Sequence, residues 1–181
     1  MKLLIASDIH GDLDSITNVI EAFYNEKCDK ILLLGDILYH GPRNDLPSSY
    51  APKEVIQQIN TNHDLFLAVR GNCDTEVDQM VLECPIMADY AYLLLDGLSV
   101  FATHGHIFNA ENPPKLRSGE ILLHGHTHIP ACEMFANDNY YLNPGSAAIP
   151  KGGYPKTYMI YENRCFTIKD FDGNILLTKQ F

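Results

Sequence analysis

The chain carries residue types that bind divalent metal ions, and they stand in short motifs that follow apolar segments. The motifs are S-D-I-H-G-D, L-L-L-G-D, R-G-N-C-D, T-H-G-H and H-G-H-T-H. Together they supply two carboxylates, one amide oxygen and four imidazoles, from Asp8, His10, Asp36, Asn72, His104, His126 and His128. Oxygen and nitrogen donors of this kind suit manganese, iron, zinc, cobalt and nickel. Seven such groups are enough to hold two divalent ions if the fold brings them together.

The histidines give the clearest indication of a metal site. Five of them fall between His104 and His128, where they alternate with Gly and Thr after two strand-like segments. Packing explains such a cluster poorly, whereas neutral imidazole is a common nitrogen ligand for transition metals. His40 and His63 lack this setting and are predicted not to be ligands, with the alternative that His40 lines the site.

The remaining ligand types each have a second interpretation. Asp8 and His10 stand at i and i+2, so in an extended chain both side chains face one side and can reach one metal. Asp is equally typical of a helix start. Asp36 ends a buried strand, where a carboxylate is costly unless it is paired or bound to a cation, although a plain strand-end residue is the alternative. One carboxylate can bridge two metals, and Asp36 is predicted to be that bridge. Asn72 taken alone is typical of a turn.

The segments between the motifs predict an α/β first half and a mostly β second half. Apolar runs predict strands at Lys2–Ser7, Lys30–Leu34, Leu65–Val69, Tyr90–Leu95, Leu98–Thr103, Ile121–His124, Ala131–Phe135, Tyr140–Leu142, Thr157–Tyr161, Cys165–Asp170 and Ile175–Lys179. Helical spacing predicts helices at Leu13–Asn25, Lys53–Thr61 and Glu76–Leu82. The first strand, helix and strand form a βαβ unit, which implies a parallel pair. Asp96-Gly97 predicts a hairpin, and a further turn is predicted at Asn137–Asn139.

Composition limits the class of protein. At 181 residues the chain is predicted to be one domain, residues 1–181, with two packed sheets and flanking helices. It contains no apolar stretch near the roughly 20 residues that a membrane span needs, and no signal-peptide pattern. Five cysteines without a C-x-x-C pair predict reduced thiols, so we expect a cytoplasmic protein. A net charge of −10 and the lack of a basic run argue against binding to extended nucleic acid.

In this order the motifs, followed by N-P-G-S at Asn143–Ser146, resemble those of the calcineurin-like metallophosphoesterase superfamily. Within it, the phrases at His40–Asn44, Ala68–Asp74, Glu76–Met80 and Asn143–Gly153 resemble the small bacterial YfcE-type phosphodiesterases. The resemblance spans essentially the whole chain. It implies a four-layer αββα sandwich of two mixed β-sheets flanked by helices. It also implies that one ion is held by Asp8, His10, Asp36 and His128, and the other by Asp36, Asn72, His104 and His126.

One position departs from the wider superfamily. Many members have a histidine after the G-N pair, where it is thought to protonate the leaving group or hold the phosphate, and this chain has Cys73. YfcE-type proteins share the cysteine. A thiol is a poor general acid at neutral pH, so phosphomonoesters and poor leaving groups are expected to react slowly. Cys73 is expected beside the substrate as a small, partly buried thiol.

The expected reaction is hydrolysis of small phosphodiesters, in which a metal-bridging hydroxide attacks phosphorus. The predicted catalytic residues are His10, Asp36 and Asn72, and His10 would also donate a hydrogen bond to the substrate. Arg43 would bind the substrate phosphate, although an exposed arginine is often only solvated. Manganese is expected by resemblance, with zinc, iron, cobalt and nickel as alternatives. A homo-oligomer is compatible with these patterns.

Two other functions remain open at this point. The same fold serves as a scaffold in the Vps29 subunit of retromer, where ligand residues and catalysis are lost. The site could alternatively hydrolyse phosphomonoesters or dinucleoside polyphosphates. Segment Asn143–Gly153 is predicted to be a plain pair of turns, with the alternative that its backbone orients His126 or His128.

Overall fold

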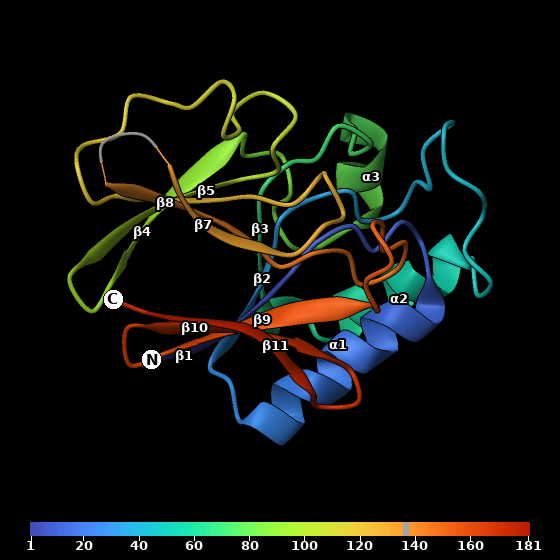
Figure 1. Ribbon diagram of the computed structural model, residues 1–181. Helices are drawn as coiled ribbons and strands as arrows, with labels where there is room; N and C mark the ends of the chain where they lie inside the picture. The colour runs from blue at the N-terminus through green and yellow to red at the C-terminus, as the bar shows by residue number, and fades with distance from the viewer. Residues whose placement is uncertain (136–137) are drawn as a thin grey trace.

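Two β-sheets form the body of the protein (Figure 1), whose computed structural model describes residues 1–135 and 138–181. The six-stranded sheet has the order β11-β10-β9-β1-β2-β3, and the five-stranded sheet has the order β4-β5-β6-β8-β7. The first sheet consists of β1 (Lys2–Ala6), β2 (Lys30–Leu33), β3 (Phe66–Ala68), β9 (Thr157–Glu162), β10 (Cys165–Asp170) and β11 (Ile175–Gln180). The second consists of β4 (Tyr90–Leu95), β5 (Leu98–Thr103), β6 (Ile121–Leu123), β7 (Ala131–Phe135) and β8 (Asn139–Asn143).

Strands β1 and β2 are buried on both faces, which explains their unbroken apolar sequence. Side chains alternate across a strand. In β1, Leu4 and Ala6 therefore pack against the helices, whereas Leu3 and Ile5 pack between the two sheets. The pair is parallel, as the predicted βαβ unit requires, and Leu4 lies opposite Ile31.

Helices α1 (Leu13–Glu26) and α2 (Pro52–Thr61) lie at the outer face of the six-stranded sheet (Figure 1). The one-turn helix η1 (His63–Leu65) precedes β3, and α3 (Glu76–Val81) lies apart from that face, at the top of the view. Helix α1 buries a stripe that includes Ile16, Val19 and Phe23. Pro52 is the first residue of α2, where a missing backbone N–H costs nothing.

The predicted two-sheet sandwich is confirmed, and the hairpin at Asp96-Gly97 forms with φ angles of 48° and 83°. The helices are unevenly distributed, because in the described residues none follows Val81. On the five-stranded sheet, Phe108 of the β5–β6 connection instead packs on Phe101 of β5, with ring centroids 5.6 Å apart. The turn predicted at Asn137–Asn139 begins outside the described residues. No helix in the described part of the chain has the length and apolar character of a membrane span.

The topology gives the sheets a common functional edge. Strands β1, β2 and β3 are parallel to one another, and so are β5, β6 and β8. The carboxyl ends of parallel strands open at one edge of a sheet, where ligands of open α/β sheets usually bind. Every predicted metal ligand follows one of these strands.

Candidate metal centre

The seven predicted ligands come from both sheets. Asp8 follows β1, Asp36 follows β2 and Asn72 follows β3. His104 follows β5, and both His126 and His128 follow β6. Asp8, His10, Asp36, His104 and His128 are buried, His126 is half-buried and Asn72 is exposed. The polar groups therefore form a deep site with one open side.

Left-handed backbone conformations aim these side chains. Positive φ angles occur at Asp8 (59°), His10 (49°), Asp36 (55°), His126 (66°) and His128 (61°). Such a conformation costs a non-glycine residue about 1–2 kcal/mol and is typically retained at functional sites. The prediction that Asp8 and His10 meet because they lie on one face of an extended chain was wrong. β1 ends at Ala6, and two left-handed residues turn the side chains toward each other.

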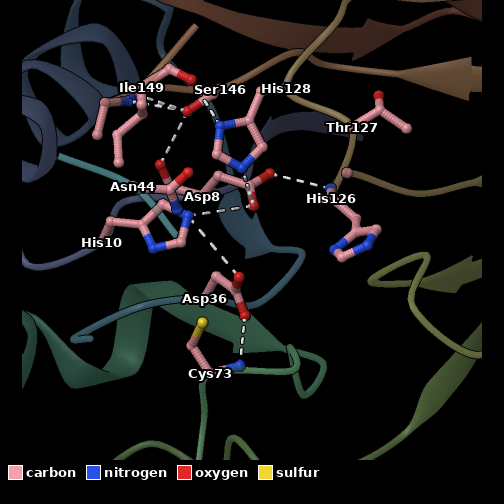
Figure 2. A network of polar contacts seen from close by, with 12 residues as sticks. Asp8, His10, Asp36, Asn44, Cys73, His126, Thr127, His128, Ser146 and Ile149 are labelled. Atoms are coloured by element: carbon pink, nitrogen blue, oxygen red, sulfur yellow. Dashed lines mark hydrogen bonds and ion pairs between the residues drawn. The ribbon is translucent and has the colours of Figure 1, made fainter. Parts of the chain in front are cut away.

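One group of ligand atoms surrounds Asp8 (Figure 2). His128 Nε2 lies 3.3 Å from Asp8 Oδ1, and His10 Nε2 lies 3.6 Å from the same oxygen. His10 Nε2 is also 3.7 Å from Asp36 Oδ2.

A second group surrounds His104. Its Nε2 lies 3.5 Å from Asp36 Oδ2, 3.1 Å from Asn72 Oδ1 and 3.1 Å from His126 Nδ1. Asp36 Oδ2 is thus near the imidazoles of both groups. The structure brings the seven predicted residues close together, with Asp36 between the group around Asp8 and the group around His104.

The spacing of these atoms fits divalent metal ions. A metal–ligand distance of about 2.1 Å gives ligand–ligand separations of about 3.0 Å in octahedral and 3.4 Å in tetrahedral geometry. The observed separations run from 3.1 to 3.7 Å. Asp8 Oδ1 and His10 Nε2 are also buried without a hydrogen-bond partner among the described residues. A bound cation would satisfy both atoms, since buried polar groups rarely remain unpartnered.

Backbone carbonyl groups orient three of the imidazoles. The Nδ1–H groups donate to carbonyl oxygens at distances of 2.7, 2.6 and 2.5 Å, in the pairs His10–Tyr39, His104–Leu34 and His128–Ile149. This bond leaves the Nε2 lone pair free to bind a metal. Because both ring nitrogens of His10 are then engaged, no N–H remains for the hydrogen bond to substrate that the sequence suggested. The partner Ile149 also shows that segment Asn143–Gly153 is more than a pair of turns.

The buried carboxylates and imidazoles of the site shift one another's pKa values. Burial would raise the pKa of Asp8, but the nearby imidazoles of His10, His128 and His104 outweigh that effect and hold the pKa well below its usual value. Burial likewise opposes the charge on Asp36, and His104 nevertheless lowers the pKa of Asp36. Burial would lower the pKa of His104, yet the neighbouring carboxylates raise it to about 9. The carboxylates are therefore ionised and ready to bind cations.

Asp74 supports Asp36 and was not predicted as a site residue. Its buried carboxylate accepts hydrogen bonds from the backbone N–H groups of Asp36, Ile37 and Gly71 at 2.8, 2.8 and 2.7 Å. These bonds hold the left-handed turn at Asp36. Gly71 is required by close approach, because an added Cβ would collide with Asp36 Oδ1. The only sequence signal was the aspartate of the G-N-C-D motif.

A hollow of about 430 Å³ opens over the candidate metal ligands. Its lining includes Asp36, Asn72, His126 and His128, together with Arg43, Cys73 and Lys151. Arg43 and Lys151 are exposed and bring positive charge to the opening. Lys151 was missed, although it stands in the P-K-G-G phrase after N-P-G-S.

Cys73 lies at the floor of this hollow. Burial raises the pKa of its thiol, so the group is neutral at physiological pH. Its backbone N–H donates to Asp36 Oδ1 at 2.8 Å, as Figure 2 shows. The sequence predicted a small, partly buried thiol at this position, and the structure shows a buried one.

The chain is similar to known proteins in sequence and in fold. The domain model of the calcineurin-like phosphoesterase superfamily matches residues 1–164. Phosphodiesterase YfcE from Escherichia coli K12 is 45% identical over 168 residues, which cover 93% of this chain and 91% of that protein. Phosphodiesterase MJ0936 from Methanocaldococcus jannaschii is 29% identical over 163 residues, or 86% of this chain and 89% of that protein.

Solved structures agree with these matches. The structure of the E. coli phosphoesterase Yfce has a TM-score of 0.95 at 43% identity and covers 99% of this chain and 98% of its own. Vacuolar protein sorting 29 from Cryptosporidium parvum has a TM-score of 0.63 at 17% identity, with coverage of 99% and 97%. The second likeness concerns the fold alone.

Proposed function

Because the chain belongs to the calcineurin-like phosphoesterase superfamily, we propose that it hydrolyses small phosphodiesters with the help of two divalent metal ions. Its relatives YfcE and MJ0936 are phosphodiesterases, so the chain is a phosphoric diester hydrolase. The observation that carries the dinuclear proposal is the position of Asp36 Oδ2, which lies 3.7 Å from His10 Nε2 and 3.5 Å from His104 Nε2. One carboxylate between two sets of imidazoles is what a bridging ligand requires.

We assign the ligands in two overlapping sets. One ion would be held by Asp8, His10, Asp36 and His128, and the other by Asp36, Asn72, His104 and His126. When bound, two divalent ions would supply a hydroxide nucleophile by lowering the pKa of water and would neutralise charge on the phosphoryl oxygens. Manganese is our choice of metal, and the oxygen and nitrogen donors also suit zinc, iron, cobalt and nickel.

The protein's own cations have a different task. Arg43 and Lys151 line the hollow over the ligands, where they can bind the nonbridging oxygens of a phosphodiester and the oxygen of the departing alcohol. Asp74 keeps Asp36 in position through the backbone. Cys73 carries a neutral thiol and is a weak hydrogen-bond donor, so leaving groups that need protonation should react slowly.

The ligand set argues against a scaffold of the Vps29 type. A scaffold has no need for seven ligand groups, two of them carboxylates held ionised in a buried site. A phosphomonoesterase or dinucleoside polyphosphate hydrolase would use the same metals, and Cys73 disfavours the monoesterase.

We also propose that residues 1–181 act as one domain. Strands β1 and β2 contribute side chains both to the apolar core beneath the helices and to the apolar core between the two sheets. The five free cysteines support our proposal of a cytoplasmic enzyme. That the protein forms a homo-oligomer stays a prediction, which measurement of its mass in solution by sedimentation can test.

The test compares initial rates on bis-p-nitrophenyl phosphate and p-nitrophenyl phosphate, with chelated protein before and after manganese is added. Hydrolysis of the diester that depends on manganese, with little hydrolysis of the monoester, would support the proposal. Absence of turnover despite two bound ions by elemental analysis would refute it in favour of a scaffold.

A further inference from the structure

A second hollow opens beside the metal centre. Its volume is about 280 Å³, and it shares His126 and Thr127 with the hollow over the metal ligands. In Figure 2 these two residues stand to the right of the cluster around Asp8. A group in the second hollow would therefore be a near neighbour of a phosphate at the metals.

The two hollows differ in charge. Arg43 and Lys151 line the first, whereas no lysine or arginine lines the second among the described residues. The second instead has Glu111, which is exposed at its edge. In diester hydrolysis the departing oxygen gains negative charge and is stabilised by donors and cations. A phosphodiester has two alcohol groups, which we call its ester arms. The arm that departs would therefore lie on the side of Arg43 and Lys151, and the arm that stays on phosphorus would lie in the second hollow.

The walls of the second hollow offer hydrogen-bond acceptors. His124 stacks on Tyr141, with ring centroids 4.4 Å apart, and both line the hollow. The Nδ1–H of His124 donates to the carbonyl of Gly125 at 3.0 Å, so Nε2 of the neutral ring is an acceptor. That Nε2 is buried and has no partner in the part of the chain that the structure describes. Because that Nε2 is inaccessible to solvent, the charged acceptor that the hollow presents to a ligand is the carboxylate of Glu111, which favours a ligand that carries N–H or O–H groups.

We propose that the hollow lined by Ala110, Glu111, His124 and Tyr141 binds the ester arm that stays on phosphorus. That arm is a small alcohol residue with N–H or O–H donors and without negative charge, and Glu111 favours an ammonium group. The proposal rests on the phosphodiesterase function proposed above. The volume agrees with a small arm, since pockets for whole drug-sized ligands begin at about 300 Å³.

A charge reversal tests the preference. The substrates are diesters from which p-nitrophenolate departs and in which the other arm is 3-aminopropyl, 3-hydroxypropyl or 2-carboxyethyl. Wild-type kcat/KM should be highest for 3-aminopropyl and lowest for 2-carboxyethyl. Glu111→Lys should shift the ratio between these two substrates by about tenfold toward the carboxylate, because reversing an exposed charge acts on both in opposite directions. Glu83→Lys is the matched control, since Glu83 is exposed, pairs with His63 and lies outside both hollows.

A second variant tests occupancy without changing charge. Ala110→Trp would fill the hollow, so kcat/KM for the 3-aminopropyl diester should fall by about tenfold or more, while that for methyl p-nitrophenyl phosphate stays near wild type. Unchanged ratios in both variants, with normal metal content, would overturn the inference. If Ala110→Trp lowers kcat/KM for the 3-aminopropyl diester while Glu111→Lys leaves the substrate ratio unchanged, the hollow still binds the arm, but the proposed preference for an ammonium group is overturned. If the wild type with two bound metals hydrolyses none of these diesters, the proposed function itself fails.

Discussion

Replacement of Asp74 by asparagine tests how the metal centre is positioned. Asp74 is neither a predicted metal ligand nor a predicted substrate-binding residue. Its carboxylate accepts hydrogen bonds from three backbone N–H groups around Asp36. Oδ2 accepts those of Asp36 and Gly71, and Oδ1 accepts that of Ile37. An asparagine has one carbonyl oxygen. One backbone N–H would therefore face an NH2 group and lose its partner.

The magnitude follows from these bonds. Loss of one hydrogen bond to a charged acceptor costs about 1.5–3 kcal/mol, and the two remaining bonds weaken because the acceptor becomes neutral. An opposing effect exists, since burial raises the pKa of Asp74 and removal of its charge relieves part of that cost. We expect the free energy of unfolding to fall by about 2 kcal/mol. We expect metal affinity at the His104 group, and with it kcat, to fall by about 10- to 100-fold, as is typical of residues that orient a ligand.

The assays are urea unfolding of the chelated protein, calorimetric titration with manganese and initial rates on bis-p-nitrophenyl phosphate. Asp45→Asn is the control, because it removes the same charge from an exposed position before α2. Wild-type stability together with wild-type metal affinity in Asp74→Asn would refute the argument that backbone contacts from Asp74 position Asp36. A loss of stability alone would assign Asp74 a purely structural role.

Three further predictions concern the centre itself. Asp36→Asn should lower metal-dependent turnover by about a hundredfold or more while the fold is kept, because both metals lose a charged ligand; full turnover would exclude the bridging role. Cys73→His should raise monoester hydrolysis relative to diester hydrolysis by about tenfold or more by supplying a general acid, and an unchanged ratio would argue against that reasoning. Because the pKa of His104 is raised to about 9, its imidazole is protonated at pH 7.5 and must lose that proton when a metal binds. Manganese binding at pH 7.5 should therefore release about one proton from His104, which calorimetry in buffers of different ionisation enthalpy can measure. The chelated protein should accordingly lose stability as pH rises from 6.5 toward 9, since a raised pKa in the folded state stabilises only while the group stays protonated.

Much of the fold follows from local sequence. Helix α1 runs from Leu13 to Glu26, where the spacing of Ile16, Val19, Ile20 and Phe23 predicted Leu13–Asn25. The hairpin at Asp96-Gly97 and strand β10 have the predicted bounds. Period and turn chemistry are properties of neighbouring residues, so they can be interpreted without a partner segment. The confinement of helices to the first half of the chain was predicted, but the sheet face that each helix covers was not, because it depends on packing between distant segments.

The residue types of the candidate centre could also be identified in the sequence, because such motifs of metal-binding residue types are rare. The resemblance to the superfamily suggested how these residues are grouped. The matches to the superfamily's domain model and to YfcE confirm that resemblance. The sequence by itself thus determined which groups are the candidates for the chemistry. Only the tertiary structure decided how they are held. The left-handed turns at Asp8 and His10 set the directions of their side chains. The bond from His128 to the carbonyl of Ile149 and the contact of Asp74 with Asp36 join segments far apart in the chain. Such pairings arise from strand order and sheet packing, which no local pattern encodes.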